Sequence, residues 1–216
     1  MQPLKVTAHL YNGFAAADDW SPALDGILGY WQLYLADPEY FALTQGRNDL
    51  VRPPDGLPLE KIEDGEWWWW AASSPLYRLH QTHRTYFHRR FDDQHERYME
   101  ESVKTVITKA GPYKNYRKSL LFRVTDRIEW HCVGDEARIL ELLSHCHHVG
   151  AKPAQGYGRV KDWSVEPGDE RLALYHRPLP VDYARRAGVA GPTMTWGVRP
   201  PARLPINNTL CVMPSS

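Results

Sequence analysis

Residues 122–150, FRVTDRIEWHCVGDEARILELLSHCHHVG, decide the fold of this chain. In the first part of the stretch apolar and polar side chains alternate, and Asp126 is the single break in the apolar face. Alternation with a period of two is typical of a half-buried strand. The sequence therefore predicts one strand over 122–132.

A helix is expected directly after this strand. Asp135 suits its N-cap, because an aspartate side chain accepts hydrogen bonds from the first free backbone N–H groups of a helix. Ile139 and Leu143 recur at helical spacing and predict its buried side. The histidines at 147–148 would occupy the last turn, and Gly150 suits the left-handed C-cap position.

The flanking segments predict three further elements. Residues 4–10 alternate between apolar and polar side chains, which indicates a first strand. Ser21 and Pro22 are typical of a helix start, and apolar residues at helical spacing follow over 24–35. A last strand is expected over 157–165.

Four consecutive tryptophans at 67–70 indicate another strand, with two rings on each face. Core packing or contact with a protein partner is favoured over base stacking, because the neighbouring acidic residues Glu63, Asp64 and Glu66 would repel phosphates. The order strand, helix, strand, strand, helix, strand predicts an α+β protein. Its expected form is a ferredoxin-like (RRM-like) βαββαβ domain with an antiparallel sheet.

Two segments extend this plan. A domain over 1–166 would contain a long insertion at about 78–118, between the second and third strands, where a short loop would suffice. The segment 167–216 holds 8 prolines and is expected to run as an extended C-terminal tail without its own core.

The charge of the chain is segregated. Residues 1–77 hold 4 Lys and Arg against 11 Asp and Glu, whereas residues 78–127 hold 12 against 6. Clustered cations attract phosphates, so the insertion is a candidate nucleic-acid surface. The alternative, a solvated basic face that binds nothing, stays open on charge alone.

Composition indicates a soluble, cytoplasmic protein without a membrane segment or signal peptide. Hydrophobic residues make up 43% of the chain and charged residues 24%. The longest apolar run is far below the ~20 residues of a membrane-spanning helix. Three scattered cysteines are too few for a disulfide framework.

The segment 150–159, GAKPAQGYGR, is a glycine-rich loop between the expected second helix and last strand. Lys152 and Arg159 frame it with positive charge, which suits a phosphodiester chain. It is neither a Walker loop nor a dinucleotide fingerprint, because it precedes a strand instead of opening a helix. A turn that merely closes the sheet is the alternative.

This loop, together with the residues PALDGIL at 22–28 and QGYGRV at 155–160, resembles the RAMP superfamily of CRISPR-associated RNA-binding proteins. With the tryptophan-rich strand added, residues 4–165 look most like the type IV effector subunit that caps the 5′ end of the guide RNA. The resemblance implies a noncatalytic RNA-binding subunit that holds the 5′ handle of the guide. It also implies contacts with the backbone and large subunits of the effector, and leaves contact with target DNA open.

In such a subunit the insertion would be the thumb, which pins the guide near the handle. Basic residues with aromatic rings between them, here Tyr86, Phe87, Tyr113 and Tyr116, suit single-stranded RNA. The candidate RNA-binding residues are Arg84, Arg89, Arg90, Lys104, Lys109, Lys114, Arg117 and Lys118 in the insertion, and Gly150, Lys152, Gly156, Tyr157, Gly158 and Arg159 in the loop.

The alternative function is a metal-independent endoribonuclease that processes precursor guide RNA. Some members of the superfamily cleave RNA with a histidine or tyrosine near the Gly-rich loop, and His83 with Tyr86 or Lys109 is the candidate set. A zinc site at Cys132 and Cys146 is disfavoured, since no closely spaced cysteine pair exists. No cofactor or metal is expected.

Overall fold

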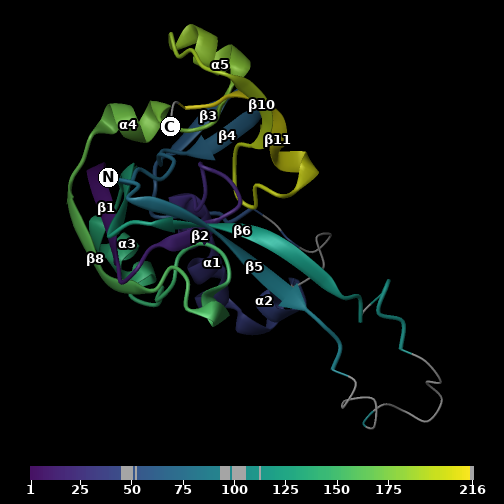
Figure 1. Cartoon of the computed structure of the whole chain (residues 1–216). Helices are drawn as coiled ribbons and strands as arrows, with labels where there is room; N and C mark the ends of the chain where they lie inside the picture. Colours follow the sequence, from purple (N-terminus) through teal and green to yellow (C-terminus); the bar gives the residue numbers. More distant parts are fainter. Residues whose placement is uncertain (45–50, 52, 93–97, 99–105, 112, 215–216) are drawn as a thin grey trace.

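Figure 1 shows a computed structural model of the chain, in which residues 1–44, 51, 53–92, 98, 106–111 and 113–214 are described. Helices and antiparallel sheets make up the described part, so the α+β prediction is confirmed. None of the described helices is long and apolar enough to span a membrane. The elements in chain order are β1 (Gln2–Leu10), β2 (Phe14–Ala16), α1 (Leu24–Ala36), α2 (Pro38–Thr44), β3 (Lys61–Asp64), β4 (Trp67–Trp70), β5 (Gln81–Arg89), β6 (Tyr116–Val124), β7 (Arg127–Gly134), α3 (Glu136–Leu143), η2 (Pro153–Gln155), β8 (Val160–Pro167), α4 (Glu170–Tyr175), β9 (Leu179–Pro180), α5 (Val181–Arg186), β10 (Thr193–Gly197), η3 (Pro205–Asn207) and β11 (Asn208–Val212).

The central antiparallel sheet has the strand order β7-β1-β8. Val6 of β1 lies opposite Trp130 of β7 and Val165 of β8, so apolar residues of all three strands share one face. Helices α1 and α3 cover this face through Leu28 and Ile139, both fully buried. The alternation predicted over 4–10 is confirmed, because its apolar members form this core.

Helix α1 begins later than Ser21 and Pro22 predict. Its N-cap is Ala23, which makes no side-chain cap. The Ser21 hydroxyl instead donates to Oδ2 of Asp18 at 3.2 Å. The Pro22 carbonyl accepts a hydrogen bond from Nε1 of Trp130 at 2.9 Å, which joins the start of the helix to the sheet.

The prediction of one strand over 122–132 is wrong, because the chain bends at 125–126 into two strands of different sheets. The Thr125 hydroxyl donates to the carbonyl of Arg127 at 2.9 Å, and the Asp126 carbonyl accepts the N–H of Leu10 at 2.7 Å. The first bond is local and the second reaches β1, and together they stabilise a turn at the single break in the apolar face. Strand β6 therefore leaves the central sheet and pairs with β5 and β2.

Strands β5 and β6 form a long two-stranded ribbon that projects from the body of the molecule (Figure 1). Their register runs from Gln81 opposite Val124 to Arg89 opposite Tyr116. This ribbon is called here the basic ribbon. Strand β5 and the start of β6 lie within the predicted insertion at about 78–118, and residues 119–124 of β6 lie beyond it. The predicted role of the ribbon as a thumb concerns RNA binding and not strand pairing.

The ferredoxin-like strand order stays a prediction. The tryptophan strand β4 pairs with β3 in a separate hairpin. The chain after β4 meets the edge of β7 only through isolated bridges, Ala72 to Cys132 and Leu76 to Glu129. The sheet therefore has an irregular segment where a regular second strand was expected.

Helix α3 confirms part of its prediction. The Asp135 side chain accepts the N–H of Arg138 at 3.2 Å, and Ile139 and Leu143 are buried. The helix ends at Leu143, so the histidines at 147–148 and Gly150 lie beyond it. The expected last turn and glycine C-cap are wrong, because Ser144 is already the C-cap of this helix.

The C-terminal segment 167–216 is not an extended tail, and this prediction is wrong. Its described residues, up to 214, form the helices α4 and α5, the short helix η3 and the sheet β10-β11-β9. Its apolar residues, such as Leu179 and Val212, pack around the buried ring of Trp69. The prolines lie between or at the ends of these elements, where a missing N–H costs little.

The four tryptophans therefore divide between two cores. Trp70 belongs to the core under the central sheet and Trp69 to the C-terminal core, where its ring lies 4.8 Å from that of Tyr183. Both rings are at most 3% exposed. The prediction of two rings per face is confirmed, but these two are not available to a protein partner.

Arg177 joins the two cores. Its guanidinium donates to the carbonyls of Trp70 and Ala72 and, at 2.7 Å, to that of Val198. It also lies 3.8 Å from the Asp25 carboxylate in α1, and both side chains are buried. Burial raises the pKa of Asp25 above its usual value, and the Arg177 charge opposes that rise.

Replacing Arg177 with methionine should lower the free energy of unfolding by about 3–5 kcal/mol, because it leaves the Asp25 carboxylate buried without its partner. Urea denaturation measures the change. Arg185→Met is the matched control, since the Arg185 side chain is 77% exposed. Equal effects of the two substitutions would contradict the joining role of Arg177.

His131 should make stability depend on pH. Its Nδ1 accepts the N–H of Asp169 at 2.9 Å, and burial lowers its pKa below the usual 6.5. The unfolded chain therefore takes up a proton first, and the free energy of unfolding should fall as the pH drops below about 6.5. His131→Asn keeps an acceptor and should flatten this fall, whereas exposed His88→Asn should not. Burial also lowers the pKa of His176, so the part of the pH dependence that comes from His176 should remain in the His131→Asn variant.

Candidate RNA-binding surface

Cations line both faces of the basic ribbon. Neither β5 nor β6 contains an aspartate or glutamate. Because side chains alternate along a strand, Arg84 and Arg117 share one face, and Arg89 and Lys118 share the other. The predicted cations of the strands therefore form a surface without neutralising partners on the ribbon itself.

The other predicted cations of the insertion lie further out. Arg90 directly follows β5, and Lys109 and Lys114 are exposed in the segment beyond the strands. Lys104 lies outside the described residues. The described distal cations extend the charge of the ribbon beyond its paired strands.

The predicted stacking rings support the cations. The guanidinium of Arg117 lies 3.7 Å from the ring centre of Tyr86. The ring of Tyr116 lies 5.6 Å from that of Phe87 and beneath the Lys118 ammonium. Such contacts fix long flexible side chains above the ribbon, which reduces the entropy that they lose on binding an anion.

The Gly-rich loop is held against the turn between β1 and β2. The backbone N–H of Ala151 donates to the carbonyl of Ala15 at 2.7 Å, and the N–H of Gly158 donates to the carbonyl of Gly13 at 3.0 Å. A Cβ on Gly158 would lie 1.8 Å from the Val149 carbonyl oxygen. Close backbone approach thus explains Gly158, so the loop has a structural role whether or not it binds a ligand.

The loop and the basic ribbon form one continuous surface. The ring of Tyr157 lies 5.0 Å from that of Phe122, and its hydroxyl is hydrogen-bonded to that of Thr85 at 3.1 Å. The Lys152 ammonium lies 3.5 Å from the ring centre of Phe87. All three ribbon residues lie on the face that carries Arg89 and Lys118. The structure therefore brings the loop together with Arg89 and Lys118, whereas Arg84 and Arg117 lie on the opposite face of the ribbon.

Sequence reasoning missed three members of this surface. Thr85 and Phe122 contact Tyr157. The guanidinium of Arg159 lies 4.9 Å from the ring centre of Tyr11. Phe122 was assigned to a core strand because the bend at 125–126 was not foreseen. No pattern around Thr85 or Tyr11 indicated a contact with the loop.

The candidate catalytic set is not assembled on one face. His83 and Tyr86 lie three residues apart on β5, so their side chains point to opposite sides of the ribbon. Lys109 lies in the segment beyond the strands, outside the paired register. Of the candidate trio, no two are held in contact by a described hydrogen bond.

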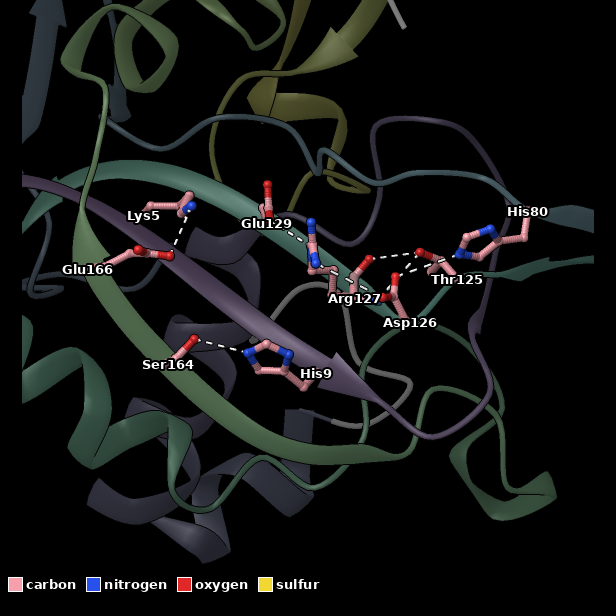
Figure 2. A network of polar contacts seen from close by, with 9 residues as sticks. All are labelled: Lys5, His9, His80, Thr125, Asp126, Arg127, Glu129, Ser164 and Glu166. Carbon is pink, nitrogen blue, oxygen red and sulfur yellow. Dashed lines mark hydrogen bonds and ion pairs between the residues drawn. The ribbon is translucent and has the colours of Figure 1, made fainter.

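The face of the central sheet turned away from α1 and α3 carries paired charges (Figure 2). Lys5 binds Glu166 at 2.9 Å, and Arg127 binds Glu129 at 2.9 Å. Cations already paired with carboxylates attract phosphates weakly. The residues drawn there include the imidazole rings of His9 and His80 but no Phe, Tyr or Trp.

No metal centre is found within the described residues, which contain no suitable group of three or more His, Cys, Asp or Glu side chains. Cys132 in β7 and Cys146, which lies beyond the end of α3, are both buried in the core. Burial raises the pKa of Cys132 to about 12, so its thiol stays protonated at neutral pH.

Together these features define an antiparallel α+β protein in which a Gly-rich loop and a basic ribbon form one surface. A family model described as CRISPR type IV associated protein Csf3 matches residues 2–203. The chain belongs to this family of type IV CRISPR-associated proteins. The match extends well into the C-terminal segment, beyond residues 4–165 that carried the resemblance. No curated protein matches the chain.

Gly158→Ala should disrupt the loop, and Gly156→Ala is its matched control. Both glycines have positive φ, so each alanine costs about 1–2 kcal/mol of strain. Only the Gly158 substitution also forces a Cβ onto a backbone oxygen, whereas the Cβ at Gly156 meets nothing within 4 Å. Thermal denaturation should show a clearly larger loss for Gly158→Ala. Similar losses would mean that the loop relaxes freely.

Proposed function

We propose that this chain is a noncatalytic RNA-binding subunit of a type IV CRISPR ribonucleoprotein effector. It holds the 5′ handle of the guide RNA in cytoplasmic, RNA-guided defence against foreign DNA. In this proposal the central sheet with α1 and α3 is the ferredoxin-like RAMP domain, and the basic ribbon is its thumb. Family membership supports the type IV setting.

One observation carries the proposal: the basic ribbon has no carboxylate on either strand and is joined to the Gly-rich loop. A protein cation that is already surrounded by carboxylates gains little binding free energy from contact with a phosphate. A row of unpaired Arg and Lys releases counterions when it binds a polyanion, and this release drives nucleic-acid association. The paired charges of Figure 2 lack this property.

The ribbon contacts are suited to the RNA backbone. Arg and Lys side chains bind phosphates whatever the sequence, so they position a strand without reading its bases. Recognition of the base sequence of the 5′ handle therefore requires residues other than these Arg and Lys side chains.

The backbone and large subunits of the effector would meet the remaining surface. The acidic N-terminal third carries the ring of Tyr34 on α1, which is 40% exposed. Aromatic residues are enriched in protein interfaces. This surface replaces the buried tryptophans as the expected protein contact.

The geometry favours a binding role over the endoribonuclease alternative. General acid–base cleavage of RNA needs two proton-transferring groups that converge on one phosphate. His83 and Tyr86 point to opposite faces, and the Arg117 guanidinium covers the Tyr86 ring. We therefore propose that the chain binds the guide without cutting it.

Replacing Arg89, Arg90 and Arg117 with alanine should weaken binding of a labelled precursor guide RNA and reduce its salt dependence. Each lost phosphate contact lowers the slope of log K against log salt by about 0.7 for a single strand, so three contacts give about 2. Filter binding over a range of salt concentrations measures both quantities.

The matched control removes the same charge from exposed arginines away from the ribbon, Arg138, Arg171 and Arg185. An equal change of slope in both triple variants would contradict the ribbon assignment. The same samples, incubated without metal, test catalysis. Cleavage at one position that is abolished by His83→Ala would replace the binding role with the endoribonuclease.

A further inference from the structure

A second concave site lies beside the Gly-rich loop, away from the ribbon face. It is a cavity of about 640 Å³ between α1, the segment 15–23 and the chain that leaves α3. Its volume lies within the range of small-molecule sites. None of the residues described so far as RNA-binding cations lines it, so it is separate from the phosphate surface.

The cavity offers stacking surfaces for a flat ring. Trp31 and His145 line it with rings 6.1 Å apart and tilted by only 32°. Tyr30 stands beside them, and small residues such as Ala23 and Gly26 leave the remaining wall open. Flat aromatic ligands, among them nucleobases, stack on such rings.

Asp18 adds one oriented acceptor group. Its Oδ1 accepts the N–H of Trp20 at 3.0 Å, and its Oδ2 accepts the hydroxyl of Ser21 at 3.2 Å. Each carboxylate oxygen has two acceptor positions, so both keep one for a ligand. The negative charge disfavours a phosphate and favours a group with N–H donors.

The Gly-rich loop separates this cavity from the ribbon. Gly150, Ala151 and Pro153 line the cavity, whereas the side chain of Lys152 reaches the opposite way to Phe87. An RNA strand that crosses the loop would place a phosphate near Lys152 and the adjoining base at the cavity mouth. The loop thus links the two sites.

We propose that this cavity binds one unstacked nucleobase of the RNA strand, and that Asp18 selects guanine. Guanine presents two neighbouring donors, N1–H and the N2 amino group, which match the two oxygens of a carboxylate. Uracil, adenine and cytosine present at most one donor group on that edge. This inference rests on the proposed function, since the phosphate surface delivers the strand.

Oligouridylates of about eight nucleotides with a central guanosine, inosine or uridine test the selection. Inosine lacks the N2 amino group and forms one hydrogen bond fewer to the carboxylate. The full chain should bind the guanosine oligomer about tenfold more tightly than the inosine one, a factor that equals about 1.4 kcal/mol. Uridine should bind no better than inosine.

Two variants test the location. Asp18→Asn keeps an acceptor for Trp20 but removes the charge, and Gly26→Met fills the cavity from a position where a Cβ meets nothing within 4 Å. Both should abolish the preference for guanosine and leave uridine binding unchanged. The controls are Asp37→Asn, an aspartate that accepts the N–H of Tyr40 outside the cavity, and Ala137→Met on the exposed side of α3.

Equal affinities for the three oligomers, or a preference that survives Gly26→Met, would overturn this inference and leave the proposed function intact. Failure to bind any oligomer, while the chain remains folded, would overturn the proposed function and the inference with it.

Discussion

The buried guanidinium of Arg177 is the interaction on which the arrangement of this molecule depends. A buried charge is tolerated only when hydrogen bonds and an opposite charge replace its water. Three backbone carbonyls and the Asp25 carboxylate do so here, and they come from β4 and the segment after it, from the C-terminal unit and from α1. The contacts of this one side chain thus hold three parts of the chain against one another.

That constraint sets the position of β4 and, through it, the division of the protein into two cores. With β4 held in place, Trp70 faces the central sheet and Trp69 faces the C-terminal unit. Helices α1 and α3 take one face of the central sheet, and paired charges occupy part of the other (Figure 2), where α4 also packs against Val133. The basic ribbon, whose two strands carry no carboxylate, projects from the body of the molecule (Figure 1).

Local patterns predicted the elements whose sequence signal lies within a few adjacent residues. The alternation at 4–10 and the Asp135 cap are two such signals, and both were confirmed. The bend at 125–126 could not be predicted, because the turn depends on Leu10, which is distant in sequence. The C-terminal fold was missed because its core needs Trp69. For the candidate site, the basic residues were visible in the charge distribution, but the contact of Tyr157 with Thr85 and Phe122 depends on tertiary structure.

The placement of Trp69 has a consequence for the order in which the protein can form during synthesis. Its partners include Leu179 and Val212, which leave the ribosome long after β4 has been made. Until then a large apolar ring and its neighbours stay exposed to solvent, which is the kind of segment that chaperones bind and that aggregates at high concentration. Completion of the fold is therefore coupled to translation of β11.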